Sequence, residues 1–223
     1  AHNDYLHEVP FYSAYKSGFG SIEADVFLVN GDLLVAHGKS ELQKDRTLSK
    51  LYLMPLKAEL KKNPERRLIL LIDIKEKYPE ALSILVKQLK PLKKRLTTQN
   101  RQGQLLVVIS GNRPLPSQYL NYPDYLYFDS DLSKTHTASE WKRVGLVSLQ
   151  FSKISKWKGE GEISSKDKAL LKQKIDSVHI TGKKIRFWAA PDNEYAWNVL
   201  MKLGVDFIGT DKIEELTTFI KNL

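Results

Sequence analysis

The chain has 223 residues, of which 42% are hydrophobic and 27% are charged, as in ordinary globular proteins and unlike disordered or fibrous ones. It has no cysteine, which excludes disulfides, cysteine-ligated metals and thiol nucleophiles. The longest apolar runs, 68–72 and 105–109, are far shorter than the roughly 20 residues that cross a bilayer. Length and even composition predict a single domain over residues 1–223.

The chain is basic, because 35 Lys and Arg against 26 Asp and Glu give a net charge of +9. Such a charge permits an anionic partner: a nucleic acid, an acidic membrane surface or a phosphorylated small molecule. The basic residues concentrate in three segments, 57–67, 87–95 and 153–174. Helical spacing in the second segment indicates a solvated helix face. Basic and aromatic residues do not alternate as in a nucleic-acid groove. We therefore expect no nucleic-acid partner and at most peripheral membrane contact.

Short β-rich runs alternate with helical segments along the chain. We predict strands at 21–29, 33–36, 68–74, 105–109, 125–128, 146–151, 185–189 and 207–209. We predict helices at 53–60, 80–96 with an interruption near Pro91, 164–178, 194–203 and 210–223. Asn30-Gly31 predicts a tight hairpin between the first two strands. Ser164 and Asp192 are the expected caps of two helices, and Gly204 is the expected end of one.

Seven of these strands alternate with helices, and a stub at Ala1 would be an eighth. Alternation of this kind implies a parallel sheet in an α/β protein. Eight units in a chain of this length fit a single (β/α)8 TIM barrel, whose size range starts near ~200 residues. An open, doubly wound sheet would fit the same alternation.

Carboxylates interrupt the strands in a regular way. Glu23 and Asp25 are two residues apart in a strand, so both side chains point to one face. Asp73 ends a run of apolar residues, where a carboxylate is costly unless it is paired or binds a metal. Three carboxylates at neighbouring strand ends suit Mg²⁺ or Ca²⁺ better than zinc. The alternative is that they simply pair with lysines, Asp73 with Lys75 in particular.

Histidines complete this pattern, because His2 opens the chain and His37 follows the predicted hairpin. Histidine carries protons near neutral pH, so both are candidate acid–base groups. We interpret the remaining histidines as surface or loop residues: His7, His136 and His179. Arg113 follows a buried strand and could hold a phosphate with its forked guanidinium. No dinucleotide-binding, P-loop or serine-hydrolase motif is present.

Five spaced elements resemble the glycerophosphodiester phosphodiesterase and phosphatidylinositol-phospholipase-C-like superfamily of TIM-barrel phosphodiesterases. They are His2-Asn3-Asp4, Glu23-Ala24-Asp25, the Asn30-Gly31 hairpin, Ala36-His37 and Asp73-Ile74-Lys75. Phe187-Trp188 and the segment 204–211 resemble the last strands of that family. His2-Asn3-Asp4 replaces the usual His-Arg-Gly of the family. Most glycerophosphodiesterases have Glu at the position of Asp73. An Asp at this position resembles the sphingomyelinase D branch.

The resemblance implies a role for each matching residue. Glu23, Asp25 and Asp73 would hold one divalent cation, and His2 and His37 would be the catalytic acid and base, in an order the sequence leaves open. The expected substrate-binding residues are Lys75, Arg113, Trp188 and Asn3. The most similar members that we can name are bacterial proteins that are typically exported. We therefore expect an exported protein, periplasmic or secreted, whose leader has been removed.

The function predicted from this resemblance is that of a monomeric, metal-dependent phosphoric diester hydrolase. Its substrate would be a glycerophosphodiester or a (lyso)phospholipid-like molecule, and a hydroxyl next to the phosphate would lead through a cyclic phosphate. No Ser or Cys in the motif is placed as a nucleophile. The alternative is a catalytically weak barrel that binds a phosphorylated ligand. A nucleic-acid-binding protein is a third hypothesis, and it rests on net charge alone.

Overall fold

The computed structural model describes residues 1–223, and all eight strands belong to one sheet. The strands are β1 (Ser21–Val29), β2 (Asp32–Val35), β3 (Leu68–Ile74), β4 (Leu105–Gly111), β5 (Leu126–Ser130), β6 (Val144–Gln150), β7 (Ile185–Trp188) and β8 (Phe207–Ile208). Their order in the sheet is β2-β1-β3-β4-β5-β6-β7-β8. Every neighbouring pair is parallel except β1 and β2, which form the antiparallel hairpin.

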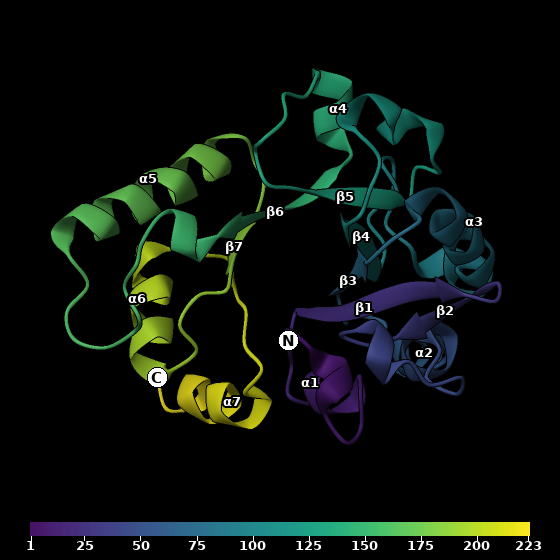
Figure 1. Ribbon diagram of the computed structural model, residues 1–223, viewed down its shortest axis with the longest axis horizontal. Coiled ribbons are helices and arrows are strands. Elements are labelled where there is room, and N and C mark those ends of the chain that lie inside the picture. The colour runs from purple at the N-terminus through teal and green to yellow at the C-terminus, as the bar shows by residue number, and fades with distance from the viewer.

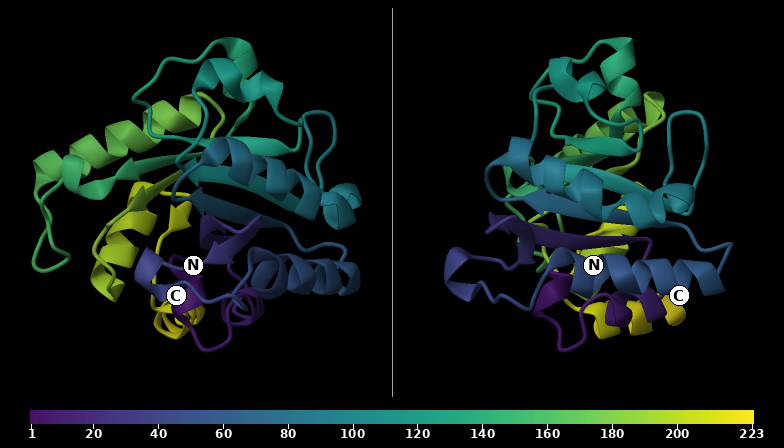
Figure 2. Two further views of the ribbon diagram at one scale, coloured as in Figure 1. Left: turned by 45° about the vertical axis from the view of Figure 1, so that its right-hand side comes forward. Right: turned by 90° about the vertical axis from the view of Figure 1, so that its right-hand side faces the viewer.

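The helices lie outside the curved sheet, as Figures 1 and 2 show. They are α1 (Tyr12–Lys16), α2 (Met54–Lys62), α3 (Tyr78–Gln88), α4 (Ala138–Lys142), α5 (Ser165–Ile180), α6 (Glu194–Leu203) and α7 (Ile213–Lys221). Short 3-10 helices fill several connections, at Asp4–Leu6, Lys39–Glu41, Lys90–Arg95, Pro116–Asn121 and Phe151–Lys153, and a π-helical turn, Ser49–Leu53, leads into α2. None of the helices is both long and apolar enough to span a bilayer.

The first two residues take the place of the first barrel strand. Ala1 donates its terminal amine to Ser21 O at 2.6 Å, and Ala1 O accepts from Glu23 N at 3.1 Å. On the other side, His2 N donates to Thr210 O at 2.9 Å. The N-terminal residues thus bridge β1 to the segment after β8, and with the seven parallel strands they give the eight positions of a (β/α)8 barrel. The expected barrel is confirmed, and the open doubly wound alternative is not.

The core has two parts, because the strands bury both faces. Five side chains fill the inside of the barrel: Ile69, Leu71, Val108, Tyr127 and Leu146. A cluster of 42 residues packs the outer faces of the strands against the helices. Strands buried on both faces need nearly continuous apolar sequence, and β3 therefore coincides with the predicted run 68–74.

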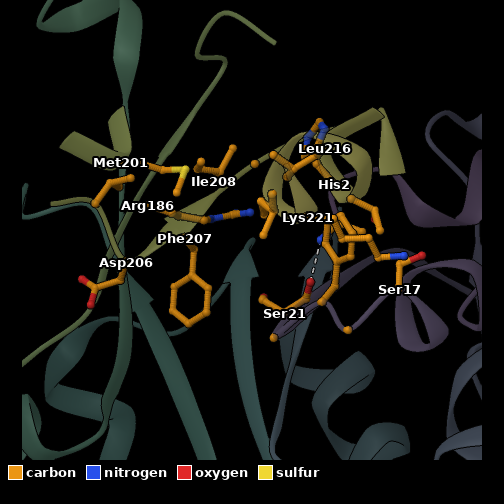
Figure 3. A pocket seen from close by; sticks show the side chains of 18 residues that line it. His2, Ser17, Ser21, Arg186, Met201, Asp206, Phe207, Ile208, Leu216 and Lys221 are labelled. Atoms are coloured by element: carbon orange, nitrogen blue, oxygen red, sulfur yellow. Dashed lines mark hydrogen bonds between the residues drawn. The ribbon is translucent and has the colours of Figure 1, made fainter. Parts of the chain in front are cut away.

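A groove of about 400 Å³ runs beside the seam that the first residues bridge (Figure 3). Phe207 and Ile208 line one wall, Phe19 and Ser21 the other, and Leu216 of α7 closes the outside. The dashed line in Figure 3 is the hydrogen bond from Ala1 to Ser21. Ala1 and His2 therefore connect the two edges of the sheet beside this groove.

Local signals set most element boundaries. Asn30 and Gly31 have φ values of 49° and 81°, which a type I′ hairpin requires. Ser164 caps α5 by accepting from Asp167 N at 3.0 Å, and Gly204 ends α6 with φ 90°. The predicted Asp192 cap is wrong: Asn193 caps α6 by accepting from Ala196 N.

Other boundaries differ for physical reasons. The predicted helix 80–96 divides into α3 and the 3-10 helix Lys90–Arg95, because Pro91 lacks an amide hydrogen and cannot continue an α-helix. The last helix begins at Ile213 rather than at Thr210. Thr210 and Asp211 precede the helix, and both form hydrogen bonds with His2.

Candidate active site

Three carboxylates converge on one face of β1 and β3, near the point where the parallel pairing of these strands ends at Val26 and Ile74. Asp25 and Asp73 are direct register partners across these strands, and Glu23 precedes Asp25 by two residues on the same face. One carboxylate oxygen from each residue lies within 4.8 Å of the other two. Glu23 and Asp25 are buried, and Asp73 is half-buried. The strand spacing in the sequence thus predicted a real cluster, which we call the acidic triad.

Lys75 neutralises one side of the acidic triad. Its Nζ lies 2.6 Å from both Asp25 Oδ2 and Asp73 Oδ2. Burial opposes the charged form of Lys75, but the two carboxylates outweigh burial and raise its pKa. Burial also raises the pKa of Asp25, although hydrogen bonds from Lys75 and Tyr5 offset part of the rise. The Asp73–Lys75 ion pair, which the sequence offered as an alternative to a carboxylate cluster, therefore forms as part of that cluster.

Arg186 on β7 neutralises the other side. Its Nη1 lies 2.5 Å from Glu23 Oε2, and its Nε donates to Ser148 Oγ at 2.8 Å. Burial opposes ionisation of Glu23, yet the guanidinium outweighs burial and lowers the pKa of that carboxyl. Three carboxylates thus face two cations, which leaves room for one further positive group.

His2 is held by an acidic partner from the other end of the chain. Its Nδ1 lies 2.8 Å from Asp211 Oδ1. Burial opposes protonation of His2, but the hydrogen bond to Asp211 and the charge of Glu23 outweigh it and raise the pKa of His2. The hydrogen bond with His2 in turn lowers the pKa of Asp211. When Nδ1–H donates to Asp211, Nε2 of His2 is free to act on a ligand.

His37 lies beside Asp25, and Tyr5 links the two side chains. The Tyr5 hydroxyl is 3.2 Å from His37 Nδ1 and 2.7 Å from Asp25 Oδ2. If Tyr5 donates to Asp25, its oxygen can accept from His37 Nδ1–H. Nε2 of His37 then remains available, as it does in His2. Each histidine is therefore tied to a carboxylate through Nδ1, His2 directly to Asp211 and His37 through the Tyr5 hydroxyl to Asp25.

The residues after His2 hold this arrangement in place. Asn3, with φ 43°, lies between Tyr5 and Asp211: its Oδ1 is 2.7 Å from the Tyr5 hydroxyl, and its Nδ2 donates to Asp211 at 3.4 Å. Asp4 is fully buried and accepts from Phe11 N at 2.6 Å and from the Tyr52 hydroxyl at 2.9 Å. Asp4 thus anchors the opening segment, whereas Asn3 Oδ1 and Asp25 Oδ2 compete for the single proton of the Tyr5 hydroxyl.

A cleft of about 620 Å³ opens above the acidic triad at the carboxyl ends of the strands. His2, Glu23 and Asp73 form one part of its lining, and Arg113 and Trp188 form another. The Arg113 guanidinium is 3.9 Å from Asp131, and the Trp188 side chain is exposed. The cleft brings these predicted residues together, whereas four others do not line it: Asn3, Asp25, His37 and Lys75.

Gly111, at the end of β4, makes space for Asp73. Its φ is +67°, and a Cβ atom there would lie 1.9 Å from Asp73 Oδ1. Only glycine tolerates both this backbone conformation and this approach. The position of Asp73 Oδ1 therefore requires a glycine at position 111 of β4.

Asp129, at the end of β5, also lines the cleft and is buried. Its Oδ1 has no hydrogen-bond partner. Burial raises the pKa of Asp129 from 3.8 to about 7, against the opposing charge of Arg186. The cleft thus contains a carboxyl that still carries a proton in weakly acidic solution, close to a guanidinium.

Sequence reasoning missed four residues of this site: Tyr5, Asp129, Arg186 and Asp211. Two signals were available: Arg186 lies inside the predicted strand 185–189, where a buried charge needs a partner, and Asp129 directly follows the predicted strand 125–128. Asp211 follows the last strand, as Asp73 ends an earlier one. The sequence does not show which residues these charges pair with, since Arg186 and its partner Glu23 are 163 positions apart.

The acidic triad has the donors that a hard divalent cation requires. Its three carboxylates offer oxygen ligands at neighbouring positions, and no sulfur or imidazole donor competes within the cluster. Lys75 and Arg186 leave one unit of negative charge uncompensated. The residues therefore fit a single divalent cation, whose remaining ligands would be water and substrate oxygens.

Fold and site together define the class of protein: a TIM barrel of the phosphodiesterase type. A glycerophosphodiester phosphodiesterase from Parabacteroides distasonis superimposes with a TM-score of 0.59 at 15% identity, over 96% of this chain and 88% of that one. An Oleispira antarctica phosphodiesterase in complex with sn-glycerol-3-phosphate gives 0.57 at 15% identity, over 93% of this chain and 87% of that one. At such low identity these likenesses show the fold.

Sequence comparison gives the family. The profile described as an AIM6-like phosphodiesterase domain matches residues 1–65, and that of the glycerophosphoryl diester phosphodiesterase family matches residues 184–214. The altered inheritance of mitochondria protein 6 homolog of Arthroderma benhamiae is 31% identical over 96% of this chain and 80% of its own length. The protein of that name from Eremothecium gossypii is 26% identical over 98% of this chain and 68% of its own length. The chain belongs to this AIM6 family.

These relatives correct one expectation. The resemblance to exported bacterial proteins predicted a periplasmic or secreted protein. The curated relatives are instead fungal proteins named for the inheritance of mitochondria. The prediction of an exported bacterial protein is therefore wrong.

Proposed function

We propose that this barrel is a metal-dependent phosphoric diester hydrolase. One observation carries the proposal: at the mouth of a phosphodiesterase-type barrel, His2 shares a cleft with the acidic triad and His37 Nδ1 lies 3.6 Å from Asp25 Oδ2, with both rings held through Nδ1. A phosphodiester needs charge neutralisation at phosphorus, a base for the nucleophile and an acid for the leaving group. The residues around the triad can supply all three.

Glu23, Asp25 and Asp73 would hold one Mg²⁺ or Ca²⁺ ion, which when bound neutralises and orients a nonbridging phosphate oxygen. Lys75 keeps Asp25 and Asp73 at a fixed separation through its two 2.6 Å contacts. Arg186 holds the Glu23 carboxylate in place through its ion pair. Arg113, on the far side of the cleft, would donate to another phosphate oxygen.

We assign the acid role to His2 and the base role to His37. The raised pKa of His2 and its bond to Asp211 favour the imidazolium that donates a proton to a leaving alkoxide. His37 would take a proton at Nε2 while Tyr5 accepts from its Nδ1–H. A charge that forms on His37 is then partly balanced by Asp25, 3.6 Å away.

The proposed substrate is a glycerophosphodiester or a (lyso)phospholipid-like molecule. Trp188 offers an apolar wall for the alcohol part, and the cleft of about 620 Å³ is large enough for a headgroup with glycerol. A hydroxyl next to the phosphate would be held close to phosphorus, and proximity favours its attack over that of water. Such substrates would therefore pass through a cyclic phosphate, which His2 and His37 could open by exchanging roles.

A substrate panel tests the proposal. Glycerophosphocholine, lysophosphatidylcholine and sphingomyelin would each be incubated with Mg²⁺, with Ca²⁺ and with a chelator, and the products followed by phosphorus NMR. We expect cation-dependent turnover of at least one substrate and a transient cyclic phosphate. Turnover that is unchanged by chelation would refute the metal role. Formation of the monoester with no cyclic resonance would refute only the cyclic route.

A catalytically weak barrel that binds a phosphorylated ligand is a second candidate. The observation that favours it is the Lys75 ammonium, which bridges Asp25 and Asp73 where a cation ligand set would otherwise be free. On this account the cleft would bind sn-glycerol-3-phosphate without metal and turn over none of the panel. Calorimetry with sn-glycerol-3-phosphate, with and without Mg²⁺, separates the two candidates.

A further inference from the structure

Two of the three basic segments of the sequence come together in the folded chain. Five exposed lysines surround one depression of about 780 Å³: Lys57, Lys61, Lys90, Lys93 and Lys94. We call them the basal lysines. The first two lie on α2 and the other three on the 3-10 helix Lys90–Arg95, which contacts α2. The separate segments predicted only a solvated helix face, whereas the fold makes one concave cationic surface of them.

No acidic residue lines this depression, and none of the basal lysines forms an ion pair. Glu59, which lies on α2 between Lys57 and Lys61, pairs with Lys62 instead. Five like charges around one depression repel one another, and the repulsion disfavours the folded state. An anion that enters the depression would remove that repulsion.

Two arginines make the depression rigid without neutralising it. Arg95 donates to Leu60 O at 2.8 Å, which ties the 3-10 helix to the end of α2. Arg101 donates to Lys94 O at 2.6 Å and to Leu96 O at 2.8 Å, which ties the following turn to the same helix. Because both guanidiniums bond to carbonyl groups, the frame is ordered in advance and the lysine ammoniums stay available.

The lining also limits what can bind. It contains no hydrophobic residue, so it offers no surface for an acyl chain or for a stacked base. Its concave shape and five ammoniums suit a compact group with several negative charges better than a single small anion. We propose that the depression binds a compact cluster of phosphate groups, such as that of a polyphosphorylated inositol, either free or as the headgroup of a lipid.

This surface is separate from the candidate active site. α2 precedes β3, and Gln104, which lines the depression, directly precedes β4, so the depression lies toward the amino ends of these strands. The acidic triad lies at their carboxyl ends. A phosphate cluster bound by the basal lysines would therefore leave the cleft open, and the inference is independent of the proposed function.

The experiment measures binding of four ligands to the whole chain, the fourth being a single-stranded RNA of 20 nucleotides as a competing class. Inositol hexakisphosphate is titrated by calorimetry, and vesicles of phosphatidylcholine with phosphatidylinositol 4,5-bisphosphate are tested by sedimentation against phosphatidylserine vesicles of equal charge. The test variant is Lys57→Gln/Lys61→Gln/Lys93→Gln. The matched control, Lys142→Gln/Lys166→Gln/Lys202→Gln, removes the same charge from exposed lysines elsewhere. Circular dichroism checks that both variants fold.

We expect the wild type and the control to bind inositol hexakisphosphate, and the test variant to bind it about 100-fold more weakly, since each lost lysine removes roughly a factor of five. Additional binding to the phosphoinositide vesicles would identify a lipid headgroup, and its absence a free ligand. Equal loss in the control variant, or no binding of either probe, would overturn the proposal. So would equal binding to the phosphatidylserine vesicles, or tighter binding of a single-stranded RNA of 20 nucleotides.

Discussion

The mouth and the base of the barrel hold their charges in opposite ways. At the mouth, Lys75 and Arg186 contact the three carboxylates of the acidic triad at 2.5 to 2.6 Å, and most of these groups are buried. At the base, the five basal lysines are exposed and have no acidic partner.

This difference follows from the cost of removing charge from water. A buried charge must be paired inside the protein, because the loss of hydration is far larger than a surface ion pair returns. An exposed charge remains hydrated, so it needs no partner within the protein and is available to an external ligand. The mouth is thus organised before any ligand arrives, whereas the base is completed only by a ligand.

The largest effect is expected when either oriented histidine is removed. His2→Gln and His37→Gln should each lower kcat by about 10²- to 10⁴-fold, because each removes one proton transfer from the transition state. The control is His179→Gln, which removes a histidine paired with Asp206 away from the cleft. Steady-state kinetics on the best substrate of the panel measures the effect. A loss no larger than that of the control would remove that histidine from the mechanism.

Breaking the buried pair at the mouth should cost stability. Arg186→Met leaves Glu23 buried without a partner, and we expect the free energy of unfolding to fall by about 3 to 5 kcal/mol. Urea denaturation measures this change. Arg113→Met, in the same cleft but without a buried partner, is the control and should change stability much less. The double variant Glu23→Gln/Arg186→Met should recover part of the loss; if it does not, the pair is not what stabilises the mouth.

Asp129 should make stability depend on pH. Its pKa is raised from 3.8 to about 7 in the folded chain, so the folded state retains a proton that the unfolded state releases near pH 4. The stability that this group contributes is therefore full below pH 4 and falls as pH rises to about 7, by at most about 4 kcal/mol.

Asp129→Asn removes that dependence, so the variant should gain stability over the wild type between pH 4.5 and pH 7.5. Urea denaturation at these two pH values measures the gain, with Asp131→Asn as the matched control on the rim of the same cleft. Equal pH dependence in the wild type and Asp129→Asn would show that Asp129 ionises normally in the folded chain.

The smallest effect is expected at the base. Lys93→Gln should change the free energy of unfolding by no more than about 0.5 kcal/mol, because the side chain is exposed and makes no ion pair. The sign should be stabilising at low salt, where repulsion among the basal lysines is strongest, and the effect should vanish at high salt. Destabilisation that salt does not change would mean that Lys93 has a structural partner after all.

The sequence predicted what strand periodicity and local motifs control. Glu23 and Asp25 could be placed on one face because side chains alternate along a strand, and Asp73 could be placed beside them because it ends the next buried run. The hairpin at Asn30-Gly31 and the cap at Ser164 are local as well. These features depend on neighbours in the chain, so they can be read without knowing the fold.

What could not be predicted depends on how the barrel closes. Closure brings β7 across from β1, and only then does Arg186 meet Glu23. Asp211 reaches His2 because the chain ends meet at the seam. The concave surface of the basal lysines also requires α2 to pack against the 3-10 helix Lys90–Arg95.

Cation binding tests the central claim about the mouth most directly. Isothermal titration of Mg²⁺ and of Ca²⁺ into the wild type, Asp73→Asn and Asp131→Asn compares one triad carboxylate with one rim carboxylate of the same cleft. We predict one bound ion per chain in the wild type and in Asp131→Asn, and binding weaker by at least about 100-fold in Asp73→Asn, because a charged oxygen ligand is lost. Equal affinity in all three proteins, or no binding of either cation to the wild type, would contradict the account.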